Sequence, residues 1–363
     1  MDWETWLLNV VSSLVGGSIG GTLLLYCLDK RKVAKQQKAN KTKVAAQICH
    51  QFKKIKHFSD IVQLSLESDL IDQLLNDLPL EQAEEIYAAI NRISQNVELV
   101  RRQAEQLLAK GQNIIIDTRL IDIQLALRSD LLQLYEFFAP SHADHPIGIF
   151  KNSVIPFAKG RCGRWGIATP EEYYEKLKNY GVSYVNPFKG HSVWKKYKMI
   201  INPYGEYYFV KDEKEMTRVP DIIKEFLSTG GIWIHAGGYP FYAAFFWKKK
   251  REQSDTIFIA EEIGLEIAQT GQMSVGTIIP DGVGYLGRIN WRCENGVRSL
   301  VNADRVFAAA NVNEKQMNVL ATKVVGKGLF VHYGGLHPIN TKESEKITNM
   351  LCQLIKSIWL ERH

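Results

Sequence analysis

Apolar residues fill the start of the chain, and the pattern changes sharply after them. No charged residue occurs between Thr5 and Leu28, and about 20 apolar residues suffice for a helix to cross a bilayer. Asp2 and Glu4 are the only charged residues before this segment, whereas lysines and arginines follow it densely over residues 30–56. Because positive flanks stay cytoplasmic, the pattern predicts one transmembrane anchor over residues 1–30 in the cell (inner) membrane, with the N-terminus outside and a cytoplasmic body.

Four glycines lie inside this segment at GxxxG spacing: Gly16, Gly17, Gly20 and Gly21. Small residues at this spacing let two membrane helices approach closely. The spacing predicts a homo-oligomer, although glycine is also simply tolerated in such spans. The expected partners are therefore the membrane, through residues 5–28, and a second copy of the chain.

Helical periodicity continues over residues 31–140. Pro79 is the only proline between residues 33 and 138. Apolar residues recur at helical spacing over 60–78, 80–110 and 118–138. Helices joined by short breaks pack antiparallel, so this region is predicted to be a helical bundle or stalk.

Strand and helix patterns alternate after a turn-rich linker over residues 139–146. Short apolar strands are predicted at 147–151, 182–185, 198–202, 232–235 and 328–332. Helices are predicted at 169–180, 219–227, 239–247 and 344–360. Such alternation predicts an α/β domain over residues 147–363 with a parallel sheet covered on both faces. Ligands of such sheets bind beyond the carboxyl ends of the strands.

The amino-acid composition is that of a globular protein. The 363 residues are 45% hydrophobic and 23% charged, with a net charge of +6, which is ordinary for globular domains. The five cysteines are far apart and form neither a CxxC pair nor a cluster with zinc spacing. The sequence therefore predicts free thiols in a reducing compartment, no metal and no cofactor.

Two segments carry a family resemblance. Asn202–Glu206, followed by a predicted helix and then by Thr229–Tyr239, resemble the class I glutamine amidotransferase-like superfamily. The trehalose-utilisation-like proteins and the N-terminal domain of eukaryotic-type biotin-protein ligases are the most similar branches. The resemblance covers residue 147 to the C-terminus and implies a flavodoxin-like three-layer sandwich.

The resemblance also implies a catalytic triad that this chain lacks. Glutaminase members carry a nucleophilic cysteine in the turn after the fourth strand, where this sequence has His235. His332 matches the histidine of the family, but Gly334 stands where the glutamate should be. Without the thiolate and the orienting carboxylate, glutamine hydrolysis is not expected.

Polar residues and glycines nevertheless gather after the predicted strands. Glycines permit close approach of a ligand to the backbone, and two arginines in the loop after the first strand could hold a phosphate or carboxylate. A small polar ligand is therefore expected at Tyr204, Gly205, Glu206, His235, Gly237, Gly238, Tyr239, His332, Gly334, Gly335, Arg161 and Arg164. The alternative is that the histidines are satisfied core residues, the glycines form tight turns and the arginine loop is solvated.

These observations favour a membrane-anchored sensor or scaffold whose degenerate amidotransferase-like domain binds a small polar ligand or a protein partner. One alternative is a hydrolase or lyase that uses His235, His332 and Glu206 as candidate catalytic residues. A membrane-disrupting effector in bacterial antiviral defence is another. Nucleic acid is not expected as a partner, because the basic run at residues 248–251 is typical of a solvated helix end.

Overall fold

We analysed a computed structural model of the chain. It describes residues 18–54, 71, 75, 80–109, 118–138, 146–152, 165–187, 194–336 (except 247, 250, 272–273, 280–281, 283–284, 288 and 294) and 342–362. The predicted helix over 60–78 and the linker over 139–146 fall almost wholly outside the described residues.

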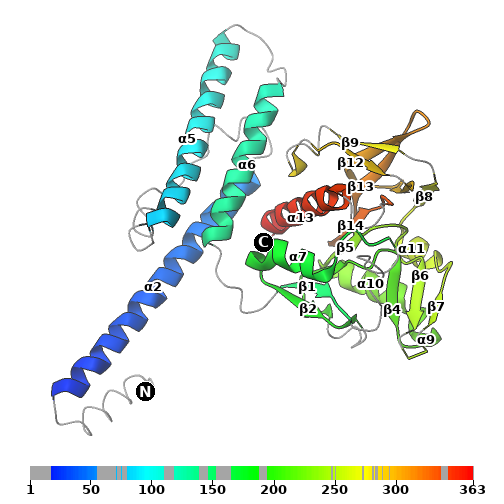
Figure 1. Ribbon diagram of the computed structural model, residues 1–363, viewed down its shortest axis with the longest axis horizontal. Helices are drawn as coiled ribbons and strands as arrows, with labels where there is room; N and C mark the ends of the chain where they lie inside the picture. Colours follow the sequence, from blue (N-terminus) through cyan, green and yellow to red (C-terminus); the bar gives the residue numbers. More distant parts are fainter. Residues whose placement is uncertain are drawn as a thin grey trace.

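Three helices make up the helical part within the described residues. They are α2 (Ser18–Lys54), α5 (Leu80–Ala109) and α6 (Thr118–Phe138). Helices α5 and α6 lie side by side, and α2 crosses α6 and extends away from the rest of the molecule (Figure 1). The predicted helices at 80–110 and 118–138 are thereby confirmed. One apolar face of each is buried, including Ile93 on α5 and Leu131 on α6, as the periodicity of the sequence requires.

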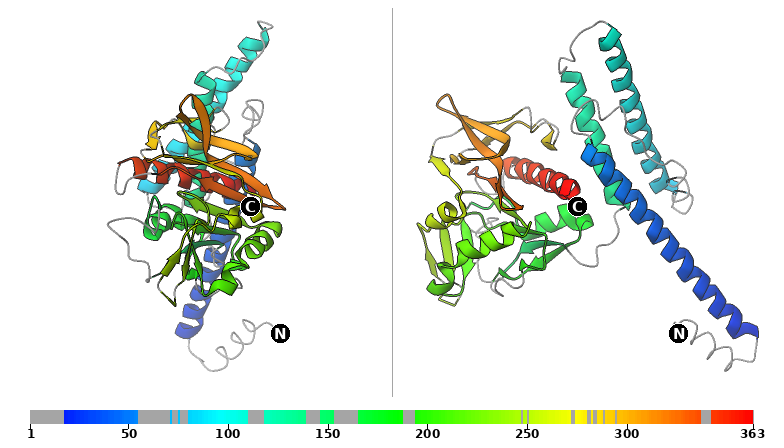
Figure 2. Two further views of the ribbon diagram at one scale, coloured as in Figure 1. Left: turned by 90° about the vertical axis from the view of Figure 1, so that its right-hand side faces the viewer. Right: turned by 180° about the vertical axis from the view of Figure 1, so that it is seen from behind.

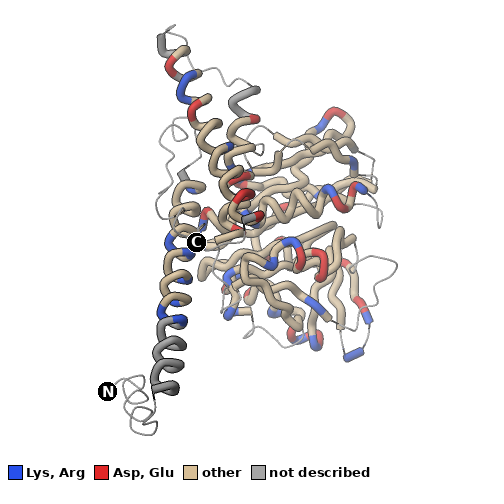
Figure 3. The backbone as a smooth tube through the Cα atoms, turned by 60° about the vertical axis from the view of Figure 1, so that its left-hand side comes forward, with Lys and Arg blue, Asp and Glu red and all other residues tan. Residues whose placement is uncertain are grey.

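The predicted membrane anchor is corrected by the structure. Among the residues that the structure describes, none of the helices combines the length and the apolar character needed to cross a bilayer. Only residues 18–28 of α2 precede the charged residues Asp29 and Lys30, and the rest of α2 carries lysines along its length (Figure 3). The first part of the predicted span, residues 5–17, lies outside the described residues. This finding overturns the transmembrane helix and, with it, the single-pass location predicted for the chain.

The second part is built on a nine-stranded sheet with the order β10-β9-β12-β13-β14-β5-β3-β1-β2. The strands of its first half are β1 (Ile147–Phe150), β2 (Val182–Val185), β3 (Met199–Asn202), β5 (Ile232–Ala236) and β14 (Gly328–Tyr333). All pairings among these five strands are parallel. The five predicted strands are therefore present, within one residue at each end.

The other half of the sheet is antiparallel, which corrects the predicted flavodoxin-like parallel-sheet sandwich. Its strands are β9 (Ser274–Ile278), β10 (Trp291–Cys293), β12 (Arg305–Val312) and β13 (Lys315–Val325). β13 pairs antiparallel with β14. The pairings of β13 with β12, of β12 with β9 and of β9 with β10 are also antiparallel. A tight turn makes this possible, because Asn313 and Glu314 both adopt positive φ between β12 and β13. The fold is α/β with a mixed sheet.

Helices cover both faces of the sheet (Figures 1 and 2). One face packs against α7 (Pro170–Leu177) and α13 (Lys342–Arg362), and the other against α10 (Val219–Ser228) and α11 (Phe258–Ile263). Helix α7 begins as the sequence predicts, since Thr169 and Glu172 form a reciprocal capping box. A short 3-10 turn, η1 (Lys178–Tyr180), follows it.

The remaining elements lie beyond the main sheet. They are β4 (Tyr207–Val210), α9 (Glu213–Met216), β6 (Ala243–Phe246), β7 (Arg251–Gln253), β8 (Ile267–Thr270) and β11 (Val297–Leu300). β4, β6 and β7 form a small sheet, and β8 pairs with β11. The predicted helix over 239–247 is wrong, because β6 pairs with β4 and buries aromatic side chains such as Phe246. An apolar run of this length fits a buried strand and a helix equally well.

The helical part and the α/β part share one hydrophobic core. Side chains of α2, α5 and α6 belong to the same buried cluster as those of α7 and α13. The guanidinium of Arg128 on α6 lies between the rings of Phe52 and Tyr285, 4.1 and 4.4 Å from their centroids. It also pairs with Glu361 of α13 at 3.0 Å. This contact fixes the helical part against the end of α13.

Candidate functional site

Two histidines lie side by side at the carboxyl ends of adjacent parallel strands. His235 of β5 and His332 of β14 are register partners, so both side chains project from the same face of the sheet. Their rings are stacked, with centroids 5.3 Å apart and planes 10° from parallel. The strands and the register therefore bring together two of the residues that the sequence predicts for the site.

The Nε2 atom of each imidazole is hydrogen-bonded to a backbone carbonyl. Nε2 of His332 lies 2.7 Å from the carbonyl oxygen of Arg298, and Nε2 of His235 lies 3.2 Å from that of Gly238. A carbonyl can only accept, so each Nε2 carries the proton and each Nδ1 presents a lone pair. Both Nδ1 atoms are buried and, within the described part of the chain, have no hydrogen-bond partner. The site thus contains two enclosed, unused acceptors.

Burial sets the charge of these rings. Both side chains are fully buried, which disfavours the protonated form. Burial lowers the pKa of His332 to about 4. Burial and the neighbouring His332 lower the pKa of His235 well below its ordinary range. Both imidazoles are therefore neutral near pH 7.

Glu206 reaches the same place through the turn after β5. Its Oε1 accepts the N–H of Tyr239 at 2.9 Å, and its side chain packs directly against Gly238, where an added Cβ would lie 2.4 Å from Cγ of Glu206. Gly238 in turn accepts the hydrogen bond from His235. The turn 237–239 therefore joins Glu206 to the histidine pair.

Gly237 holds this turn in place. Its φ is +124°, and an added Cβ would lie 1.9 Å from the carbonyl oxygen of Trp165. Its N–H donates to the carbonyl of Tyr333 at 2.9 Å. Only glycine satisfies both the backbone conformation and the close approach.

The other predicted residues around β14 and β3 are also buried near the strand ends. Gly334 bonds to Arg298 and Val319 through its backbone, and Gly335 bridges to Val297. Tyr204 is buried, and its hydroxyl accepts the N–H of Asn152 at 2.9 Å. Gly205, with φ of +61°, forms the turn that follows Tyr204. Arg161 and Arg164 lie outside the described residues.

One polar residue at this edge is absent from the sequence prediction. Asn202 is the register partner of His235 on β3, so Asn202, His235 and His332 form a row across three strands. Its amide bonds to the carbonyl of Tyr207 at 2.8 Å and to the N–H of Tyr204 at 3.2 Å. Asn202 is the last residue of a predicted strand, and this position could have identified it as a candidate site residue.

Aromatic rings pack beside the histidine pair. Phe241 and Phe330 lie 6.5 and 6.4 Å from the ring of His235, centroid to centroid. In the part of the chain that is described, no group of three or more His, Cys, Asp or Glu side chains could hold a metal ion. The arrangement offers two neutral imidazoles beside aromatic rings, with the carboxylate of Glu206 packed against the turn that follows β5.

Comparisons with known proteins give no family. No family model matches the chain, and no curated protein matches its sequence. Among solved structures, a β-galactosidase from Rahnella sp. R3 is 16% identical with a TM-score of 0.41, covering 68% of this chain and 36% of that one. A β-galactosidase from Bacillus circulans sp. alkalophilus is 12% identical with a TM-score of 0.38, covering 63% of this chain and 34% of that one.

A cytoplasmic protein from Salmonella typhimurium LT2 is 11% identical with a TM-score of 0.37, covering 59% of this chain and 97% of that one. The chain thus spans about a third of the length of the β-galactosidases it matches. At these identities and TM-scores the similarities assign no activity to the chain.

These findings correct the family assignment. No family model matches, and half of the sheet is antiparallel, unlike the parallel sandwich that the resemblance implied. The predicted membership of the class I glutamine amidotransferase-like superfamily is therefore wrong. The prediction of a membrane-anchored sensor or scaffold is also wrong, because it needed both the membrane anchor and the amidotransferase-like domain. The alternative of a membrane-disrupting effector required the same anchor and is corrected with it.

Proposed function

We propose that the α/β part is a hydrolase or lyase for a small polar substrate, with the Nδ1 atoms of His235 and His332 as its bases. The observation that carries this proposal is the pair of buried Nδ1 lone pairs without a hydrogen-bond partner among the described residues. Buried polar atoms are normally hydrogen-bonded. Two such atoms on neighbouring strands suit a hydroxyl, an amide or a water molecule that brings its own protons.

The electrostatic setting supports a base rather than an acid. A general base must be unprotonated before it accepts a proton. Because burial keeps both rings neutral near pH 7, either Nδ1 can take a proton from a bound water or from a substrate carbon or hydroxyl. The carboxylate of Glu206 accepts the N–H of Tyr239, the residue after the Gly238 whose carbonyl orients His235, and so helps to hold this turn in place.

Substitution at His332 separates catalysis from structure. In His332→Gln the amide can still donate to the carbonyl of Arg298, as Nε2 does, but it lacks the base. We expect hydrolysis of p-nitrophenyl acetate or p-nitrophenyl phosphate to fall in kcat by about 100-fold or more with little change in the melting temperature. His50→Gln, an exposed position on α2, is the matched control and should retain full activity.

Chemical modification provides a second measurement. Diethyl pyrocarbonate acylates neutral imidazoles, so its modification of the buried His332, and protection by a substrate that is hydrolysed, would show that small molecules reach this side chain. If the wild-type chain hydrolyses these esters and His332→Gln keeps the activity, or if diethyl pyrocarbonate does not modify His332, the pair is a structural feature of the core and the proposal is wrong.

A further inference from the structure

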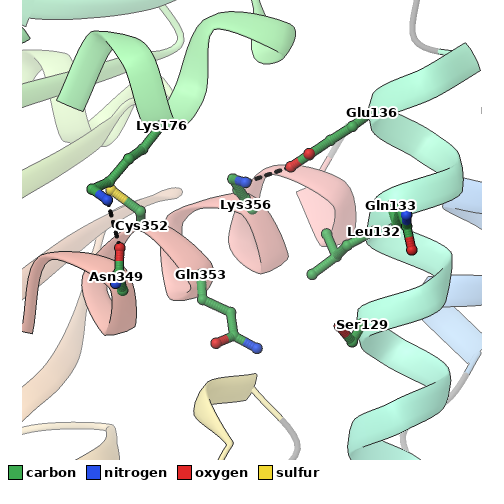
Figure 4. A pocket seen from close by; sticks show the side chains of 9 residues that line it. All are labelled: Ser129, Leu132, Gln133, Glu136, Lys176, Asn349, Cys352, Gln353 and Lys356. Carbon is green, nitrogen blue, oxygen red and sulfur yellow. Dashed lines mark hydrogen bonds and ion pairs between the residues drawn. The ribbon is translucent and has the colours of Figure 1, made fainter. Parts of the chain in front are cut away.

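A polar pocket of about 420 Å³ lies where the helical part meets the α/β part (Figure 4). Its lining comes from α6, α7 and α13: Ser129, Leu132, Gln133, Glu136, Lys176, Asn349, Cys352, Gln353 and Lys356. Sites for small molecules occupy roughly 300–1,000 Å³. The pocket is therefore large enough for a compound of metabolite size.

The side chains that line the pocket carry more positive than negative charge. The ammonium of Lys356 donates to the carboxylate of Glu136, and both side chains are largely buried. The ammonium of Lys176 donates to the amide oxygen of Asn349 at 2.6 Å, and within the described residues no carboxylate forms an ion pair with it. One positive charge is thus left over among the lining groups.

The nearby groups do not remove this charge. Glu172, one turn before Lys176 on α7, accepts the N–H of Thr169 at 2.6 Å in the capping box; it keeps its negative charge but forms no ion pair with Lys176 among the described residues. Burial raises the pKa of Cys352 to about 12, so its thiol is uncharged at neutral pH. An anion in the pocket would therefore meet an ammonium whose hydrogen-bond partner among the described residues is the neutral amide of Asn349.

Neutral donors complete the lining. Figure 4 shows the side chain of Gln353 extending from α13 into the open space, toward the side where Ser129 projects from α6. Amide and hydroxyl groups of this kind bond to the hydroxyls of a ligand. Leu132 and Cys352, both buried, form the apolar part of the wall.

We infer that this pocket binds a small hydroxylated organic anion, whose carboxylate or phosphate pairs with Lys176 and whose hydroxyls bond to Gln353. The ligand contacts α6 on one side and α7 and α13 on the other, so its binding strengthens the junction between the two parts of the molecule. No residue of this pocket belongs to the histidine site, and the inference stands whether or not the chain is a hydrolase.

Calorimetric titration of the full chain with gluconate tests the inference, with its neutral analogue sorbitol and with inorganic phosphate as parallel arms at equal ionic strength. We expect gluconate to bind and to raise the melting temperature, and sorbitol to bind at least about tenfold more weakly, because it lacks the charge-assisted hydrogen bond. Phosphate binding as tight as gluconate binding would identify the oxyanion alone as the recognised group.

Two variants locate the site. Lys176→Met should weaken gluconate binding about tenfold or more, and Gln353→Leu, which leaves the charge unchanged, about fivefold. Lys178→Met is the matched control, because Lys178 pairs with Glu175 at 3.1 Å outside the pocket, and it should change the affinity less than about twofold. Equal binding of sorbitol and gluconate, unchanged affinity in Lys176→Met, or no binding of gluconate or phosphate to the wild-type chain would overturn the inference.

Discussion

The histidine pair and the Arg128 contact are both fully enclosed, but they meet the problem of buried polar groups in opposite ways. His235 and His332 face the α10 side of the sheet, among the rings of Phe241 and Phe330. Arg128 lies on the α13 side, at the junction with the helical part. The imidazoles remain neutral, whereas the guanidinium lies between two aromatic rings and beside a carboxylate.

The difference follows from the chemistry of the two side chains. An imidazole can give up its proton, so burial appears as a lowered pKa. A guanidinium keeps its charge in proteins, so it must bring partners into the core. Burial alone therefore does not reveal the role of a polar residue, and the response to substitution distinguishes the two cases.

The largest effect is expected at the arginine contact. Glu361→Gln removes the carboxylate that pairs with a guanidinium only 4% exposed and should lower the free energy of unfolding by about 3 kcal/mol. The double variant Arg128→Met, Glu361→Gln should recover most of this loss, because the buried charge is gone as well. Urea unfolding measures both. A loss below about 1 kcal/mol for Glu361→Gln would show that the two aromatic rings are enough to stabilise the buried guanidinium without the carboxylate.

The backbone turn that orients His235 comes next. Gly237→Ala forces a Cβ against the carbonyl of Trp165 in a conformation that favours glycine, and should cost about 2 kcal/mol of stability. Gly271→Ala is the control, since an added Cβ there meets no atom within 4 Å. Equal stability of the two variants would show that the turn relaxes freely.

The pH dependence of stability reports the neutral histidines. The unfolded chain binds protons at histidine below pH ~6.5, while the folded pKa of His332 is about 4 and that of His235 is also lowered. The contribution of the neutral histidines to the free energy of unfolding is therefore at its maximum above pH ~6.5. It falls as the pH drops toward 4, by about 1 kcal/mol per pH unit for each imidazole. Urea unfolding between pH 6.5 and 5 should show a shallower slope in His332→Gln, and a slope unchanged by this substitution would mean that His332 is protonated in the fold.

The smallest effect is expected for an exposed guanidinium. Arg92 on α5 pairs with Asp130 at 2.8 Å, but its side chain is 48% exposed. Arg92→Ala should lower the free energy of unfolding by less than about 1 kcal/mol, and moderate salt should remove part of even this effect. A loss comparable to that of Glu361→Gln would contradict the view that burial makes the Arg128 pair important.

Most of the parallel half of the sheet and several helices could be predicted from the sequence. The apolar run at 232–235 and the capping box at Thr169 are local signals, and each corresponds to an element of the structure. The antiparallel strands could not be predicted as firmly, because β12 and β13 depend on a turn at Asn313 and Glu314 without glycine. Within the segment predicted as a helix, residues 243–246 form a strand because β4 offers them a partner.

The candidate site was partly predictable for the same reason. Strand ends in a parallel sheet share one edge, so the meeting of His235 with His332 followed from the pattern. The hydrogen bond from His332 to the carbonyl of Arg298 on β11 could not be predicted from the sequence pattern. The sequence carried no sign that this bond leaves Nδ1 as the free atom.

By itself, then, the sequence determined the longer helices, the parallel strands and the presence of two histidines at one sheet edge, because periodicity, capping and strand alternation act over a few residues. Tertiary structure alone decided which polar groups meet and what charge they carry. Arg128 and Glu361 are 233 positions apart, and Lys176 reaches Asn349 across the surface of two helices. Packing of the whole core creates the low-dielectric surroundings that hold the imidazoles neutral and require a partner for the guanidinium.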